Sequence, residues 1–240
     1  MKQKTFKDYG ELSVETAEQI ADIISGKPDA LLCFPAGETS LGTFRHLIDL
    51  NKRRKISFEH CRIIGLDEWV GLGEMKSENC YSFLRSNLFD HINLMEKNIC
   101  FFNGESSDLA EECRKSDEFV KEYGPVDMML LGAGMNGHLG LNEPGTPFNL
   151  WSHVTDLAET TKLIGQKYFS RKVELYKGIT LGIRHILEAG TVILQISGSG
   201  KAEVAERLIN SKTDPDFPAS VIKEHPDSWL LLDMEAARLL

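Results

Sequence analysis

Short apolar runs recur along this chain, and segments with helical periodicity lie between them. The runs cover residues 30–34, 62–66, 99–102, 126–131, 191–196 and 229–232. Runs of this length without polar alternation are typical of strands that are buried on both faces. Strands that alternate with helices favour a parallel sheet, because parallel neighbours need a crossover between them. The sequence therefore predicts a single α/β domain over residues 1–240: a mostly parallel, Rossmann-like sheet with helices on both faces.

The intervening segments carry apolar residues at helical spacing. Helices are predicted over residues 13–26, 77–91, 107–123, 159–169 and 179–187, with two more that begin near residues 41 and 201. Ser13 and Ser77 are expected to cap the first two of these segments. Asp67, Glu68 and Trp69 follow a predicted strand and are expected to begin a loop.

Composition excludes several classes of function. The chain has 240 residues and a net charge of −9, which argues against nucleic-acid partners because a nucleic-acid-binding surface must offset phosphate charge. Its five cysteines are widely spaced and form no C-x-x-C pair, so free thiols are predicted rather than disulfides or a zinc site. No signal peptide or membrane-spanning run is present in the sequence. We expect a cytoplasmic protein without a membrane partner.

The stretch of residues 126–147 changes abruptly from an apolar strand to a polar, glycine-rich loop. Its glycines permit a tight backbone, and Pro144 prevents a helix from starting at once. The polar side chains of this loop are Asn136, His138, Asn142 and Glu143. Open α/β sheets bind ligands at the carboxyl ends of their strands, so this loop is the predicted functional centre.

His138 and Asp67 are the candidate acid–base groups. Glu143 follows His138 by five residues, and a histidine oriented by a carboxylate is the usual proton-transfer group near neutral pH. A histidine that bonds Glu143 only to order the loop is an equally weighted alternative. Asp67 and Glu68 are adjacent on an extended chain, so only one of them can face a ligand. For this dipeptide alone, a solvated pair at a loop entrance is the simpler interpretation.

Two strand–turn–helix junctions could bind phosphate through backbone N–H groups. The first contains Gly37, Glu38, Thr39 and Ser40, and the second covers residues 197–201 and ends on Lys201. The first junction alone is better explained as a helix cap in which Thr39 or Ser40 satisfies unpaired N–H groups. Together, and with a lysine, the two junctions favour a small phosphate-bearing ligand. Neither junction matches the P-loop pattern.

Two features of the sequence could indicate a nucleotide cofactor or a metal, but neither meets the full pattern. Gly132, Gly134 and Gly137 fit G-x-G-x-x-G, but a dinucleotide fingerprint must open a helix directly, and here the proline-containing loop follows. The histidines lack the spacing of metal ligands, and no H-E-x-x-H occurs. We therefore expect neither a nicotinamide cofactor nor a metal.

Four motifs, taken in order, resemble one known family over nearly the whole chain. They are Pro35-Ala36-Gly37-Glu38-Thr39, Leu66-Asp67-Glu68-Trp69-Val70, the stretch N-G-H-L-G-L-N-E-P at residues 136–144, and Gly198-Ser199-Gly200-Lys201-Ala202. The chain resembles the glucosamine-6-phosphate deaminase/isomerase family. The related 6-phosphogluconolactonases have a G-H motif but lack the N-E-P that follows it. The motifs, with G-I-T-L-G at residues 178–182, look most similar to the galactosamine-6-phosphate isomerase/deaminase branch.

The resemblance implies a reaction without a cofactor. A hexosamine 6-phosphate, with galacto or gluco configuration, would be isomerised and deaminated to a ketose 6-phosphate and ammonia. Asp67 would move a proton between C2 and C1 through an enolamine. His138 would shuttle a proton in ring opening, and Glu143 would orient His138 and stabilise its charge. Asn136 stands where typical glucosamine enzymes have aspartate, and asparagine cannot act as a base.

The resemblance also implies a phosphate site formed by residues 37–40 and Lys201. Lys167 lies 29 residues after His138, where the glucosamine enzymes have a phosphate-binding arginine, and lysine lacks the planar fork of that side chain. Residues 145–153 lack the basic side chains of the allosteric site of hexameric relatives. We expect no such regulation, and a homo-oligomer remains open. The alternatives are a 6-phosphogluconolactonase-like hydrolase and a non-catalytic sugar-phosphate sensor.

Overall fold

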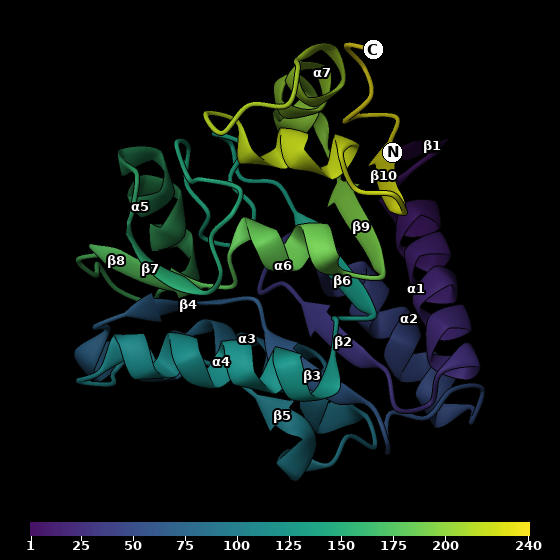
Figure 1. Cartoon of the computed structure of the whole chain (residues 1–240). Coiled ribbons are helices and arrows are strands. Elements are labelled where there is room, and N and C mark those ends of the chain that lie inside the picture. The colour runs from purple at the N-terminus through teal and green to yellow at the C-terminus, as the bar shows by residue number, and fades with distance from the viewer.

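A seven-stranded sheet forms the centre of the protein, as Figure 1 shows for a computed structural model of the chain. The structure describes the backbone of residues 1–240 and every side chain except that of Glu74. The strand order is β1-β10-β9-β6-β2-β3-β5, and all neighbouring pairs are parallel. The strands are β1 (Lys2–Phe6), β2 (Leu31–Phe34), β3 (Arg62–Gly65), β5 (Ile99–Cys100), β6 (Met128–Gly132), β9 (Thr191–Ile196) and β10 (Ser228–Asp233). The predicted α/β fold with a mostly parallel sheet is confirmed.

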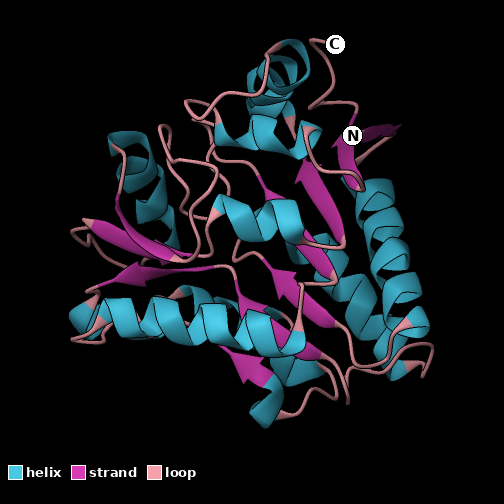
Figure 2. Ribbon diagram, viewed as in Figure 1, coloured by secondary structure: helices cyan, strands magenta, loops and turns pink.

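Helices cover both faces of this sheet (Figure 1, Figure 2). The α-helices are α1 (Tyr9–Gly26), α2 (Leu41–Lys52), α3 (Cys80–Asn87), α4 (Leu109–Tyr123), α5 (Glu159–Gly165), α6 (Ile183–Glu188) and α7 (Ala202–Asn210). The 3₁₀ turns are η1 (Glu38–Ser40), η2 (Gly73–Glu78), η3 (Phe89–His91), η4 (Glu96–Asn98), η5 (Gln166–Tyr168), η6 (Ser199–Lys201) and η7 (Pro218–Lys223). Leu31 and Cys33 pack in one apolar core with α4, α6 and α7, whereas Leu32 and Phe34 pack in a second core with α1 and α2. The strands lack polar alternation because both of their faces are buried.

A second, antiparallel sheet was not foreseen from the sequence. It contains β4 (Asp67–Val70), β8 (Lys177–Thr180) and β7 (His153–Asp156) in that order. The loop predicted to begin at Asp67 is therefore a strand, and the helix predicted over residues 179–187 begins only at Ile183. Pairing of Asp67 with Thr180 and of Glu68 with Ile179 extends the chain there. Such long-range pairing overrides a local helical pattern.

Two helix starts also differ from the prediction. The Asp8 carboxylate caps α1 by accepting from the Glu11 N–H at 3.0 Å, so the helix begins before Ser13. Ser13 lies inside the helix, where its hydroxyl donates to the Tyr9 carbonyl oxygen at 2.7 Å. Asn79, rather than Ser77, caps α3. In both helices the side-chain oxygen of the capping residue accepts an N–H from the first helical turn, as is typical of an N-cap.

The carboxyl ends of β2, β6 and β9 lie side by side, because these three strands are neighbours in the parallel sheet. Each strand leads directly into a polar loop or turn, and the second sheet lies beside this edge in Figure 1. In the part of the chain that the structure describes, no helix is long and apolar enough to cross a bilayer.

Candidate active site

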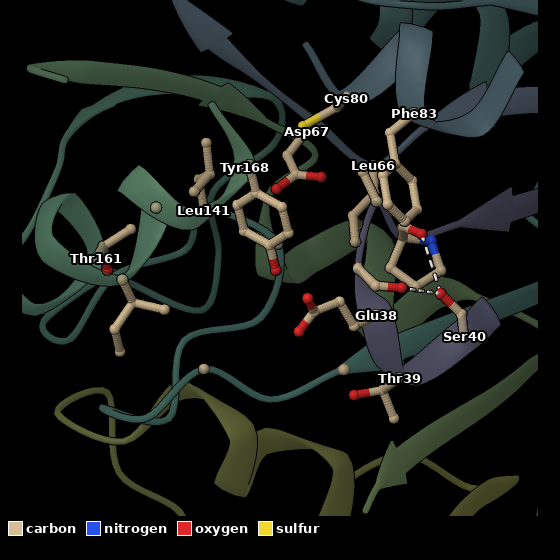
Figure 3. Close-up of a pocket in the computed structure, with 18 of the residues that line it drawn as sticks. Glu38, Thr39, Ser40, Leu66, Asp67, Cys80, Phe83, Leu141, Thr161 and Tyr168 are labelled. Atoms are coloured by element: carbon tan, nitrogen blue, oxygen red, sulfur yellow. Dashed lines mark hydrogen bonds between the residues drawn. The ribbon is translucent and has the colours of Figure 1, made fainter. Parts of the chain in front are cut away.

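A cavity of about 530 Å³ opens at this edge of the parallel sheet. Its walls come from the η1 turn, the start of β4, α3, the loop after β6, the α5–η5 segment and the β9–η6 junction. Figure 3 shows Glu38, Asp67 and Tyr168 extending into it from separate elements. The cavity also contains His138, Lys167 and Lys201 among its lining residues. Residues predicted from five distant parts of the sequence are thus brought together.

Asp67 lies at the start of β4 and lines the cavity. Burial, with the nearby charge of Glu68, raises the pKa of Asp67 from 3.8 to about 7. A carboxyl group with this pKa is well suited to proton transfer near neutral pH. The buried Cys80 thiol lies beside Asp67 in Figure 3, and burial raises the pKa of that thiol well above 9.0. Cys80 therefore remains a neutral neighbour of the carboxyl group.

Glu68 points away from the cavity, as the alternation along an extended chain requires. Its side chain is 1% exposed, and its carboxylate accepts N–H groups of Trp69 at 2.8 Å, Cys80 at 2.9 Å and Tyr81 at 3.1 Å. The last two belong to the first turn of α3, where a carboxylate is favoured by the unpaired N–H groups and the helix dipole. Glu68 thus ties β4, which carries Asp67, to the α3 wall of the cavity.

Polar groups surround the Nδ1 edge of the His138 ring. Its Nδ1 lies 3.2 Å from the Thr161 hydroxyl and 3.6 Å from Oε2 of Glu143. Asn136 donates from Nδ2 to the same Glu143 oxygen at 2.8 Å and accepts the His138 N–H at 3.2 Å. The other Glu143 oxygen accepts the N–H of Ala158, which precedes α5, at 3.1 Å. Glu143 and Asn136 therefore support His138 and do not line the cavity.

The charge of Glu143 is strongly stabilised by these neighbours. Burial acts to raise the pKa of Glu143, but its interactions with His138, Thr161 and Asn136 lower that pKa to about 2. Because Glu143 is ionised at any physiological pH, it can stabilise a proton on His138 in every step.

Glycines shape the loop that carries His138. The His138 ring packs against Gly134, where a Cβ atom would lie 2.2 Å from Cε1 of the ring. Gly137 has φ +85°, and a Cβ there would meet the Phe217 ring at 2.2 Å. Gly134 and Gly137 of the G-x-G-x-x-G pattern therefore serve close packing in this loop, against His138 and Phe217 respectively.

The second sheet anchors the other end of this loop. Thr180 of β8 accepts the Leu141 N–H at 3.2 Å and donates to the carbonyl oxygen of Leu66. The buried Asn142 amide donates to the carbonyl oxygens of Leu139 and Leu181. These bonds fix the loop relative to Asp67, the residue after Leu66. The sequence reasoning missed Thr180 as a structural link, although the G-I-T-L-G motif contained it.

The η1 turn does not behave as a simple helix cap. The Ser40 hydroxyl donates to the Gly37 carbonyl oxygen at 2.8 Å and does not accept an N–H from the helix. Thr39 and Ser40 line the cavity, yet neither provides the capping bond that the simpler interpretation required. This outcome leaves N–H groups of the turn available to an anion.

Two lysines reach the same region. Lys201 donates to the Ala133 carbonyl oxygen at 2.6 Å, and burial, with the nearby charge of Lys167, lowers the pKa of Lys201 to about 8. Lys167 donates to Oε2 of Glu38 at 2.5 Å. This part of the cavity thus combines a backbone turn, two cations and the exposed carboxylate of Glu38.

Sequence reasoning missed part of the cavity wall. Phe83 of α3, Thr161 of α5 and Tyr168 of η5 all line it. Only Tyr168 had a sequence signal, as the neighbour of the predicted Lys167. Among the described side chains, no group of three or more His, Cys, Asp or Glu residues is arranged to hold a metal ion.

Comparisons with known proteins give one consistent result. A family model described as glucosamine-6-phosphate isomerases/6-phosphogluconolactonase matches residues 9–231. A glucosamine-6-phosphate deaminase of Bacillus pumilus is 40% identical, with 98% of each chain covered. A glucosamine-6-phosphate deaminase of Clostridium novyi is 37% identical, with 100% of both chains covered. Glucosamine-6-phosphate deaminase 1 of Bacillus subtilis is 38% identical, with 100% of this chain and 99% of the relative covered.

Solved structures agree with this result. A monomeric glucosamine-6-phosphate deaminase superimposes with a TM-score of 0.95 at 38% identity, with all of both chains covered. A 6-phosphogluconolactonase from Trypanosoma brucei has a TM-score of 0.73 at 19% identity, covering 100% of this chain and 98% of that one, and shares the fold alone. The galactosamine branch is not among these relatives and stays a prediction. The chain belongs to the glucosamine-6-phosphate isomerase/6-phosphogluconolactonase family.

Proposed function

We propose that this protein is an amino-sugar-phosphate deaminase, which converts a hexosamine 6-phosphate to a ketose 6-phosphate and ammonia. The observation that carries the proposal is the meeting of three groups in one cavity: Asp67 with a raised pKa, His138 backed by a carboxylate, and two lysines near a backbone turn. The full-length similarity to glucosamine-6-phosphate deaminases supports glucosamine 6-phosphate as the first substrate to test. From that sugar, the ketose product is fructose 6-phosphate.

The reaction begins with opening of the sugar ring. His138 uses Nδ1 toward Thr161 and Glu143, so its Nε2 is the nitrogen that would exchange a proton with the ring oxygen and the anomeric hydroxyl. The negative charge of Glu143 stabilises the imidazole whenever it carries two protons. The amide of Asn136 acts on Glu143 and not on the substrate, so asparagine can replace aspartate here without removing a proton-transfer group.

Isomerisation then moves one carbon-bound proton. Asp67 as carboxylate takes the proton from C2 of the open-chain sugar while the C1 carbonyl oxygen takes up a proton from Nε2 of His138, which gives an enolamine between C1 and C2. Return of that proton to C1 gives a ketose imine at C2. The raised pKa of Asp67 matters because a stronger base removes a proton from a weakly acidic carbon more readily.

Release of ammonia requires one water molecule. Water adds to the C2 imine carbon, and the resulting carbinolamine loses ammonia as the C2 carbonyl forms. The overall change is hydrolytic at one C–N bond and needs no oxidant or reductant. On this basis we propose a hydrolytic deamination that follows an isomerisation.

Binding of the 6-phosphate would position the reacting carbons C1 and C2 of the sugar. The η1 turn, Lys201 and Lys167 would hold the 6-phosphate several bonds away from the reacting carbons. Binding energy from that remote group can pay for orientation at C1 and C2, which is how a modest base reaches a useful rate. We further propose that the chain acts as one α/β domain. The solved deaminase relative is monomeric, and sedimentation would decide whether this protein forms a homo-oligomer.

Ammonia release with glucosamine 6-phosphate and galactosamine 6-phosphate, supplied separately, tests the proposal. Asp67→Asn should abolish turnover, whereas Asp156→Asn should not, because Asp156 lies exposed on β7 outside the cavity. The faster sugar identifies the branch. Absence of ammonia from both sugars would refute the proposal, and a parallel assay with 6-phosphogluconolactone would then separate a lactonase from a sensor that binds without turnover.

A further inference from the structure

Glu38 puts a negative charge into the turn that is proposed to bind phosphate. Its side chain is 66% exposed and extends into the cavity, as Figure 3 shows. A carboxylate in this position repels a phosphate dianion, and this cost must have a compensating partner. That partner is Lys167, whose ammonium lies 2.5 Å from Oε2 of Glu38 and whose side chain is 43% exposed.

The backbones that carry this ion pair are fixed by other contacts. In the η1 turn, the Glu38 carbonyl oxygen accepts the Tyr9 hydroxyl at 3.2 Å and the Leu41 N–H. In η5, the Gln166 side chain bonds both the N–H and the carbonyl oxygen of Val173. Neither segment depends on the ion pair for its shape. The two charged side chains can therefore change partners while the turns that carry them stay in place.

The two lysines act on the same region of the cavity. Lys167 is close enough to Lys201 for its charge to contribute, after burial, to the lowered pKa of Lys201. Burial also acts to lower the pKa of Lys167, but contacts with Glu38 and Tyr168 raise it above its usual value. Lys167 is therefore charged at neutral pH, and Glu38 is the carboxylate that pairs with it.

We propose that the Glu38 carboxylate competes with the substrate phosphate for the Lys167 ammonium, and that Glu38 thereby sets the affinity of this site for phosphate monoesters. The proposal rests on the phosphate-binding role given above to the η1 turn and Lys167. A phosphate dianion displaces the carboxylate because it carries more charge and can also accept N–H groups of the turn. After displacement, Glu38 returns to solvent, to which its side chain is already largely exposed.

The expected effect is modest because the pair is partly exposed. Exposed ion pairs stabilise a protein weakly, so release of Lys167 should strengthen phosphate binding by about fivefold in Glu38→Gln. Glutamine keeps the size of the side chain and removes only its charge. The matched control is Glu159→Gln on α5, which removes the same charge from a side chain that is 90% exposed, pairs with Lys162 and lies outside the cavity.

Titration calorimetry with inorganic phosphate, at low salt and pH 7, tests the competition without any turnover. Glu38→Gln should bind phosphate about fivefold more tightly than the native protein, and Glu159→Gln should bind it equally well. In a Lys167→Met background, the gain from Glu38→Gln should shrink to less than about twofold, because only through-space repulsion is left to remove.

Three results would refute the proposed competition between Glu38 and phosphate. They are unchanged or weaker phosphate binding in Glu38→Gln, the same gain with and without Lys167, and no phosphate binding by any of these proteins at millimolar concentrations. A protein that binds phosphate as expected but releases no ammonia from either hexosamine 6-phosphate would refute the deaminase reaction alone. The two proposals can therefore fail separately.

Discussion

Glu68 is expected to control the pH at which Asp67 becomes a base. The two carboxyl groups are adjacent in β4, and Glu68 is buried and held by three backbone N–H groups that favour its charge. Cys33 and Cys80 also lie close enough to Asp67 for its charge to affect them, but burial raises the pKa of both thiols, so they remain neutral. Glu68→Gln therefore removes the main negative charge near Asp67 while it keeps the side-chain volume.

The size of the effect follows from the geometry. Side chains of adjacent strand residues point to opposite faces, so the two carboxylates lie roughly 8 Å apart. At this separation and an effective dielectric constant of about 20, two unit charges repel by about 2 kcal/mol. That repulsion equals about 1.5 pKa units. Burial supplies the larger part of the rise of the Asp67 pKa to about 7. Because the pKa of Glu68 is also raised to about 7, Glu68 is only partly charged while Asp67 titrates. The pKa of Asp67 in Glu68→Gln should therefore fall by up to about 1.5 units.

The assay is kcat/KM for glucosamine 6-phosphate as a function of pH. Asp67 must be ionised to take a proton, so activity rises with pH through its pKa, and the acid limb should move lower by up to about 1.5 units in Glu68→Gln. Burial also raises the pKa of Glu68 to about 7, so the native limb reports a coupled pair and the variant limb a single group.

The control for lost backbone contacts is Glu105→Gln. The Glu105 carboxylate also accepts backbone N–H groups, including that of Leu72 at 2.6 Å, but it lies outside the main cavity. Its acid limb should match that of the native protein. An unchanged acid limb in Glu68→Gln, or an equal shift in Glu105→Gln, would refute the electrostatic reasoning.

Four further changes have defined outcomes. Gly134→Ala would bring a Cβ to 2.2 Å from the His138 ring, so kcat should fall by about 10² or more while the thermal midpoint changes little. The pKa of Glu143 is about 2 in the folded protein and 4.5 ordinarily, so the stability that its ionised form contributes is complete above pH 4.5 and is lost as the pH falls toward 2. In urea titrations, Glu143→Gln should therefore lower the unfolding free energy by about 3 kcal/mol at pH 7 and by little at pH 2. Asn136→Asp replaces the donor to Glu143 by a second carboxylate and should cost about 1–3 kcal/mol at pH 7, with less cost at pH 4, by the same titrations. Lys201 has a pKa of about 8, so KM should rise above that pH in the native protein and stay flat in Lys201→Arg.

Local patterns in the sequence were sufficient for the parallel sheet. Strands such as β6 and β9 are buried on both faces, so their apolar runs are continuous and easily read. The polar loop after β6 was recognised as the functional centre because chain order alone puts it at a carboxyl end. Chain order also fixed the spacing of His138 and Glu143, which the structure brings within 3.6 Å.

The second sheet could not be read in the same way. Its strands have only four residues each, and their partners lie more than a hundred residues apart in the case of β4 and β8. No local period distinguishes such a strand from a loop or a short helix. As a result, the local sequence predicts a loop at Asp67 and a helix at Ile179, whereas both stretches are strands.

The sequence by itself determined the α/β class, the family resemblance and most of the charged side chains that meet in the cavity, because strand burial and short motifs are local properties of the chain. Only the tertiary structure decided which of the adjacent carboxylates, Asp67 or Glu68, faces the cavity. It also decided that Asn136 bonds Glu143 and that Lys167 meets Glu38. The orientation of Asp67 and the Lys167–Glu38 pair depend on distances between segments that are remote in sequence, and such distances exist only once the two sheets have packed together. The Asn136–Glu143 bond depends on how one loop folds on itself, which no local period of the sequence describes.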